Sequence, residues 1–175
     1  MKKLLCIVLS AVFLISAAAL PVSAQKKEEI ISVEFKSNIG GLSYLDSDKL
    51  AVIRSDNIVL SDTSLCDPVT TIDHAGSIYE GELKPGRTYC IQYYFDMKPG
   101  HEIPDELNEN NVVTVCDSGC TVHWYGITQG MCRDGRTRCY HISFYTEVTV
   151  DGNLFQRIFG RIADWFLKLR AWSPY

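Results

Sequence analysis

Six of the seven cysteines, with two nearby histidines, are the residues of this chain best suited to chemistry. The six are Cys66, Cys90, Cys116, Cys120, Cys132 and Cys139. The last four, with His123 and His141 near them, would offer thiolate and imidazole ligands of the kind that bind zinc. The Cys-x2-Cys knuckle of most structural zinc sites is missing, however, because three residues separate Cys116 from Cys120. The alternative is that the six cysteines form disulfides.

The N-terminal sequence supports the disulfide interpretation of the cysteines. Lys2 and Lys3 precede an apolar stretch at residues 4–20, and small residues follow at 22–24. This pattern is typical of a secretory signal peptide over residues 1–24, which would remove Cys6 and leave a mature chain that starts at Gln25. The apolar stretch is shorter than the roughly 20 residues of a spanning helix. Because exported thiols meet an oxidising environment, we predict three disulfides, with no metal and no cofactor.

The simplest disulfide pattern joins neighbours along the chain. It pairs Cys66 with Cys90, Cys116 with Cys120, and Cys132 with Cys139, although six cysteines allow 15 connectivities and the sequence does not choose among them. Cys132 and Cys139 would face each other across a turn centred on Asp134-Gly135.

Catalytic residues are not indicated. Asp117-Ser118-Gly119 is similar to the nucleophile segment of chymotrypsin-like proteases, but cysteines flank it where that motif has glycines, and the chain is too short for the paired barrels. A tight turn is the simpler interpretation. The histidines share no motif and are interpreted as surface or hydrogen-bonded residues; they are His74, His101, His123 and His141.

Strand patterns dominate residues 25–150. Apolar residues alternate with polar ones at 89–95 and 140–150, the period of a half-buried strand. Runs rich in β-branched and aromatic residues predict further strands at residues 30–35, 50–54, 58–60, 78–83, 111–116 and 121–128. Turns such as Lys84-Pro85-Gly86 separate them. We therefore expect a mainly β protein, an antiparallel β-sandwich, with an exposed loop at residues 101–111.

Part of this domain resembles a known family. The stretch from Glu82 to Ile91, then Lys98-Pro99-Gly100-His101 and the strand at 111–115, resembles Ig-like β-sandwich modules of secreted and surface proteins of Gram-positive bacteria. The match covers roughly residues 80–150. The chain departs from the pattern by placing Cys116 and Cys120 where those modules turn on Asn-Gly. The resemblance implies a binding, adhesion or spacer role and supplies no catalytic residue.

The chain changes period after residue 150. The apolar residues of one helical face are Phe155, Ile158, Phe159, Ile162, Trp165, Phe166, Leu169 and Trp172. Arg157, Arg161 and Lys168 lie mostly opposite this face. Asn153 is the expected N-cap, and Pro174 lies just beyond the end. Charged residues interrupt the segment too often for it to span a bilayer.

The net charge changes sign at the same boundary. Residues 25–150 contain 11 Lys and Arg against 19 Asp and Glu, a net charge of about −8, whereas residues 151–175 contain 4 against 2, or about +2. The acidic domain makes nucleic acid a poor partner. Burial of the apolar face allows three arrangements: docking on the sandwich, self-association, or insertion into a membrane interface. Aromatic residues opposite basic ones favour the interface of an anionic membrane.

These features predict a secreted or cell-surface bacterial protein without catalytic activity. Its amphipathic helix would hold an Ig-like module at the membrane or cell envelope, where the module could bind a protein or a glycan. Trp124, Tyr125, Tyr94 and Tyr145 would suit a glycan platform, although core packing explains them equally well. Two alternatives remain open: an exported enzyme or inhibitor that uses the loops between Cys116 and Cys139, and a membrane-active protein.

Overall fold

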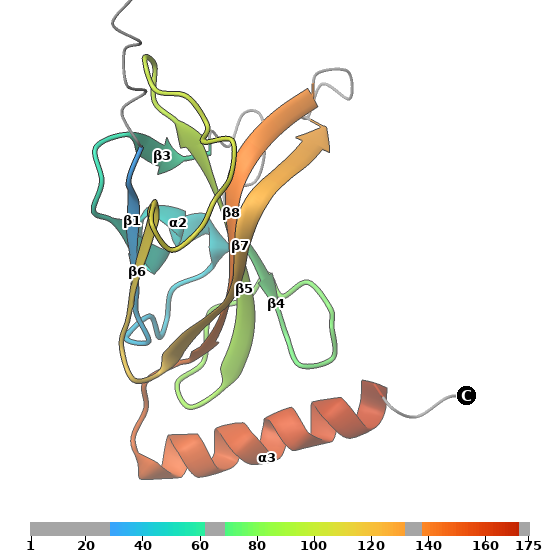
Figure 1. Cartoon of the computed structure of the whole chain (residues 1–175). Helices are drawn as coiled ribbons and strands as arrows, with labels where there is room; N and C mark the ends of the chain where they lie inside the picture. The colour runs from blue at the N-terminus through green and yellow to red at the C-terminus, as the bar shows by residue number, and fades with distance from the viewer. Residues whose placement is uncertain (1–28, 62–68, 132–137, 172–175) are drawn as a thin grey trace, which may run out of the picture.

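The computed structural model describes residues 29–61, 69–131 and 138–171 (Figure 1). The first half contains β1 (Ile31–Phe35), the 3-10 helix η1 (Tyr44–Asp46), α2 (Ser47–Leu50), β2 (Ala51–Ile53), β3 (Ile58–Leu60) and β4 (Val69–Ile72). The second half contains β5 (Thr88–Met97), β6 (Val112–Cys116), β7 (Cys120–Met131), β8 (Arg138–Thr149) and α3 (Leu154–Ala171). The expected mainly β architecture with a C-terminal helix is confirmed.

The strands form two sheets that face each other. The smaller sheet has the order β2-β1-β6, and the larger has the order β3-β5-β8-β7, with β4 also paired to β5. β3 pairs with the end of β5 and β4 with its beginning, so both lie along the same edge of this long strand. The pairing of β1 with β6 is parallel, which corrects the expectation of a purely antiparallel sandwich. β6 enters from the other sheet through a long loop, so hairpin geometry does not fix its direction.

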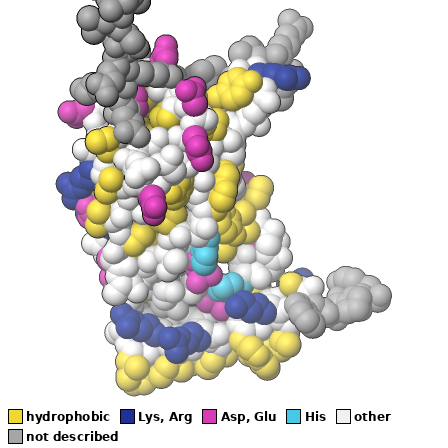
Figure 2. Space-filling view, viewed as in Figure 1, with side chains coloured by type: hydrophobic (Ala, Val, Ile, Leu, Met, Phe, Trp, Pro, Cys, Tyr) yellow, Lys and Arg dark blue, Asp and Glu magenta, His cyan; other side chains and the backbone are white. Residues whose placement is uncertain are grey.

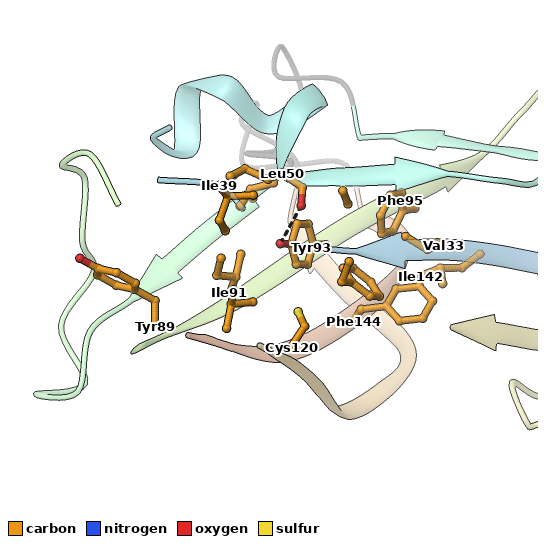
Figure 3. Close-up of a cluster of buried hydrophobic side chains, with 14 of the residues drawn as sticks. Val33, Ile39, Leu50, Tyr89, Ile91, Tyr93, Phe95, Cys120, Ile142 and Phe144 are labelled. Atoms are coloured by element: carbon orange, nitrogen blue, oxygen red, sulfur yellow. Dashed lines mark hydrogen bonds between the residues drawn. The ribbon is translucent and has the colours of Figure 1, made fainter. Parts of the chain in front are cut away.

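The core lies between the sheets and is rich in aromatic rings. β5 contributes Tyr89, Ile91, Tyr93 and Phe95, which are all buried as their alternation predicts. Phe144 of β8 packs against Phe35 of β1, with 5.5 Å between ring centroids. The Tyr93 hydroxyl donates a 3.3 Å hydrogen bond to the Leu50 carbonyl, which satisfies its polar atom inside the core (Figure 3).

Most predicted strands are present, but one is wrong. Residues 78–83 make only an isolated bridge, between Ile72 and Ile78. The chain then turns away, and the Leu83 N–H donates to the Leu42 carbonyl at 2.7 Å. Ile78 is left exposed, so its β-branched side chain does not mark a core strand. The sequence pattern also missed β4, whose Val-Thr-Thr-Ile run is short and half polar.

The predicted disulfides are not seen between described residues. Cys90, Cys116 and Cys120 carry free thiols, so neither pairing that uses them is present. Cys66 and Cys132 lie outside the described residues. Cys139 is disulfide-bonded. The structure therefore gives no support to the full three-disulfide pattern.

Candidate functional site

Helix α3 begins at a complete capping box. The Gln156 N–H donates to Asn153 Oδ1 at 3.0 Å, and the Asn153 N–H donates to Gln156 Oε1 at 2.8 Å. Each side chain satisfies a backbone donor that a helix start otherwise leaves unpaired. Asn153 is thus the N-cap that the sequence predicts. Helix α3 lies across one end of the sandwich (Figure 1).

Two glycines bring α3 against the turn before β5. A Cβ atom on Gly160 would lie only 2.1 Å from the Gly86 carbonyl oxygen. Gly86 has φ +81°, and a Cβ there would lie 2.2 Å from the Gln156 carbonyl oxygen. Both positions therefore require glycine. Gly160 requires it for close backbone approach, and Gly86 requires it for its positive φ as well. The Lys84-Pro85-Gly86 turn is the surface on which α3 docks.

Asp164 makes the main polar contact between α3 and the sandwich. It is 6% exposed, and its carboxylate accepts hydrogen bonds from Arg87 Nε at 2.9 Å and the Thr88 N–H at 3.1 Å. His74 Nε2 lies 3.7 Å from the same carboxylate. A buried carboxylate needs such partners to offset its loss of hydration. The docked side of α3 therefore carries Gly160 and Asp164, with Ala163 and Leu167 half-buried beside them.

The opposite side of α3 is the one that the sequence predicts to be apolar. We call this set the apolar stripe: Phe155, Ile158, Phe159, Ile162, Trp165, Phe166 and Leu169. Its members are 45–70% exposed. Trp172, the remaining predicted member, lies outside the described residues. Of the three arrangements that the sequence left open, docking of the stripe on the sandwich is not seen, because Gly160 and Asp164 lie on the docked side. Figure 2 shows hydrophobic side chains along the lower rim of the molecule.

Basic side chains border this stripe. Arg157, Arg161 and Lys168 follow one helical edge, which we call the basic edge, and Figure 2 shows Lys and Arg side chains directly above the hydrophobic rim. Arg157 Nε donates to the Gly152 carbonyl at 3.0 Å. Arg161 makes no hydrogen bond or ion pair with the part of the chain that the structure describes. Arg161 and Lys168 thus remain available to a partner.

A second polar group surrounds His141, but its geometry does not suit catalysis. Ser61 Oγ and Asp96 Oδ1 lie 2.9 Å and 2.6 Å from the same atom, His141 Nδ1. In a nucleophilic triad the acid and the serine use opposite ring nitrogens. The other histidines contact different acids: His74 lies by Asp164, His101 by Glu29 and His123 by Glu147.

The predicted aromatic platform is only partly formed. Trp124 is exposed on β7, whereas Tyr125 packs against the core. A Cβ on Gly126 would lie 2.4 Å from the Trp124 ring, so the indole covers this glycine of the same strand. Covering a strand glycine is a sufficient structural role for the indole.

Cys116 and Cys120 flank the Asp117-Ser118-Gly119 turn, and their thiols lie close enough to affect each other's pKa. Burial raises the pKa of the Cys120 thiol to about 12, and it also raises that of Cys116. Few thiolates are therefore present near neutral pH, which makes this pair a poor nucleophile. Cys116 ends a strand of one sheet and Cys120 begins a strand of the other, so the pair spans the two sheets.

No family model, curated protein or solved structure matches this chain. Among the described residues, no helix is long and apolar enough to cross a membrane. The fold and the arrangement of α3 are thus the features from which a function can be inferred.

Proposed function

We propose that this protein binds membrane surfaces through α3 and presents its β-sandwich there. The observation that carries the proposal is the orientation of the helix. The side of α3 that carries Gly160 and Asp164 docks on the sandwich, so the apolar stripe faces outward. A helix that lies in a membrane interface needs this arrangement, with aromatic and aliphatic side chains in the lipid and basic ones at the headgroups.

Transfer of the stripe from water into lipid is favourable. Full burial of one large apolar side chain contributes about 1.5–3 kcal/mol. The stripe side chains are about half exposed, so their transfer into lipid would contribute on the order of 5–10 kcal/mol before the loss of motional freedom is subtracted. Attraction of the basic edge to anionic lipid adds about 1 kcal/mol per cation near the surface.

A second copy of the chain fits the same surface less well. Pairing two stripes would bring two basic edges toward each other, and Asp164 cannot compensate for them because Arg87 already uses its carboxylate. Anionic lipid has the complementary charge along the whole edge. The membrane is therefore the partner that we propose.

Replacing Phe159 and Phe166 together with serine should reduce vesicle binding at least tenfold, because both rings are well exposed on the stripe. Co-sedimentation with phosphatidylglycerol-containing and pure phosphatidylcholine vesicles, at low and high salt, measures this. The matched control replaces Leu45 and Ile78, two exposed apolar residues outside α3, with serine. The wild type and the control should bind anionic vesicles, and salt should weaken this binding.

Two results would contradict the proposal. One is the absence of wild-type binding to either kind of vesicle. The other is a concentration-dependent dimer in solution that the Phe159→Ser/Phe166→Ser variant dissociates, which would assign the stripe to self-association.

The remaining expectations fit the same proposal. A signal peptide over residues 1–24 would export the chain, and the sandwich would act as an Ig-like binding or adhesion module at the cell surface. Two facing sheets around one core support this comparison at the level of architecture only.

Export leads to a prediction about Cys116 and Cys120, whose thiols lie close enough to affect each other's pKa. Exchange with an external disulfide would join the two sulfurs and release two thiols of the reagent. The new bond would close a loop of about five residues, and Cys116→Ser/Cys120→Ser should lower the unfolding free energy by about 2 kcal/mol. Mass spectrometry after alkylation without reduction tests the bond. Alkylation of both sulfurs in unreduced, denatured secreted protein would contradict it.

A further inference from the structure

A cavity of about 270 Å³ lies between α3 and the larger sheet. One wall is formed by Arg157 and Arg161 of the basic edge, and the others by the turn at Ser118, by Thr121 of β7 and by Glu147 of β8. Asp151, just before α3, also faces it. The cavity thus combines guanidinium groups, hydroxyl groups and carboxylates in one small space.

The cavity lies beside the apolar stripe, on the side of α3 that carries the basic edge. If α3 rests in a membrane interface as proposed above, its apolar side chains reach the acyl boundary and its basic edge lies at the level of the phosphates. The cavity would then open onto the headgroup layer. This inference rests on the proposed function for its location, but the chemistry of the cavity can be tested without a membrane.

The two arginines favour a phosphate. A guanidinium group presents several N–H donors in a plane that matches phosphate oxygens. Arg161 has no partner among the described residues. Arg157 donates from Nε to the Gly152 carbonyl, but its Nη2 lies 4.0 Å from Asp151 Oδ1, beyond hydrogen-bond distance. Donor capacity is therefore available on the cavity wall.

The two carboxylates restrict which phosphate fits. Glu147 and Asp151 both line the cavity, so their negative carboxylates would repel a purely anionic group. A group that carries an ammonium beside its phosphate complements both the arginines and the carboxylates of the cavity. We infer that this cavity binds the headgroup of an ethanolamine phospholipid, with its phosphate at Arg157 and Arg161 and its ammonium at Glu147 and Asp151.

The test uses soluble headgroups and the purified protein without vesicles. Titration calorimetry should detect binding of glycerophosphoethanolamine, and Arg161→Gln and Glu147→Gln should each weaken it at least tenfold. Lys168→Gln is the matched control, because Lys168 belongs to the same basic edge but does not line this cavity. It should leave the affinity unchanged. Glycerophosphoglycerol, which has the phosphate but no ammonium, should bind at least tenfold more weakly than glycerophosphoethanolamine.

Three outcomes would overturn the inference: no binding of glycerophosphoethanolamine, equal binding of the two headgroups, or an equal loss in all three variants. Co-sedimentation with vesicles that lack ethanolamine lipid separates this failure from failure of the proposed function. Vesicle binding that depends on Phe159 and Phe166, without headgroup binding in solution, would leave the membrane proposal standing and remove the headgroup site.

Discussion

An Asp164→Ala variant is expected to release α3 from the sandwich. The substitution removes the acceptor for Arg87 Nε and the Thr88 N–H, and it leaves the largely buried Arg87 guanidinium without its anion. Loss of one partner of a buried ion pair costs about 3–5 kcal/mol. Some exposure of Arg87 places the cost near the lower value, which still increases the undocked population of α3 roughly a hundredfold.

Amide hydrogen exchange over residues 154–171 measures this release. Exchange in α3 should accelerate, whereas exchange in the core strands β5 and β8 should not, because the core lies between the sheets. Asp56→Ala, which changes an exposed aspartate far from α3 in the sequence, is the matched control. The double variant Asp164→Leu/Arg87→Met should recover much of the protection, since it also removes the unpaired positive charge of Arg87. Unchanged exchange in Asp164→Ala would show that this ion pair does not hold the helix.

Local patterns predicted the elements of the fold but not all of their contacts. The alternation at 89–95 identified the buried face of β5, and Asn153 identified the start of α3, because both signals depend on neighbours within a few residues. The pairing of Asp164 with Arg87 joins residues 77 apart in the sequence. The hydrophobic periodicity of the segments that contain Arg87 and Asp164 does not indicate this contact. Helical periodicity therefore gave the apolar stripe correctly but not which side of α3 docks.

The sequence did contain one sign of the docked side. Gly160 lies in the middle of a helix, where glycine costs about 1 kcal/mol relative to alanine, and Asp164 follows one turn later on the same side. A helical glycine that weakens its helix often has a packing reason. The surface on which α3 docks could not be predicted, however, because the Lys84-Pro85-Gly86 sequence indicates only a turn between strands. The strand expected at 78–83 is absent for a similar reason, since the Leu83 N–H donates to Leu42, which is far away in the sequence.

Gly160→Ala should separate helix stability from helix docking. Alanine favours an isolated helix by about 1 kcal/mol over glycine, so an undocked α3 would become more stable. In the docked helix the added Cβ would lie 2.1 Å from the Gly86 carbonyl oxygen, a backbone atom that cannot rotate away. Relief of this overlap requires displacement of α3, and overpacking of this kind costs typically 1–3 kcal/mol or more. We therefore expect faster cleavage of α3 by trypsin at Arg161 and Lys168.

Gly130→Ala is the matched control, because a Cβ there meets no atom within 4 Å. Its cleavage rate should equal that of the wild type. Vesicle binding by Gly160→Ala should persist, since the substitution leaves every residue of the apolar stripe in place and an amphipathic helix can enter the interface without being docked. Slower cleavage of Gly160→Ala than of the wild type would mean that only helix propensity changed. The contact between Gly160 and Gly86 would then not determine the outward orientation of the stripe.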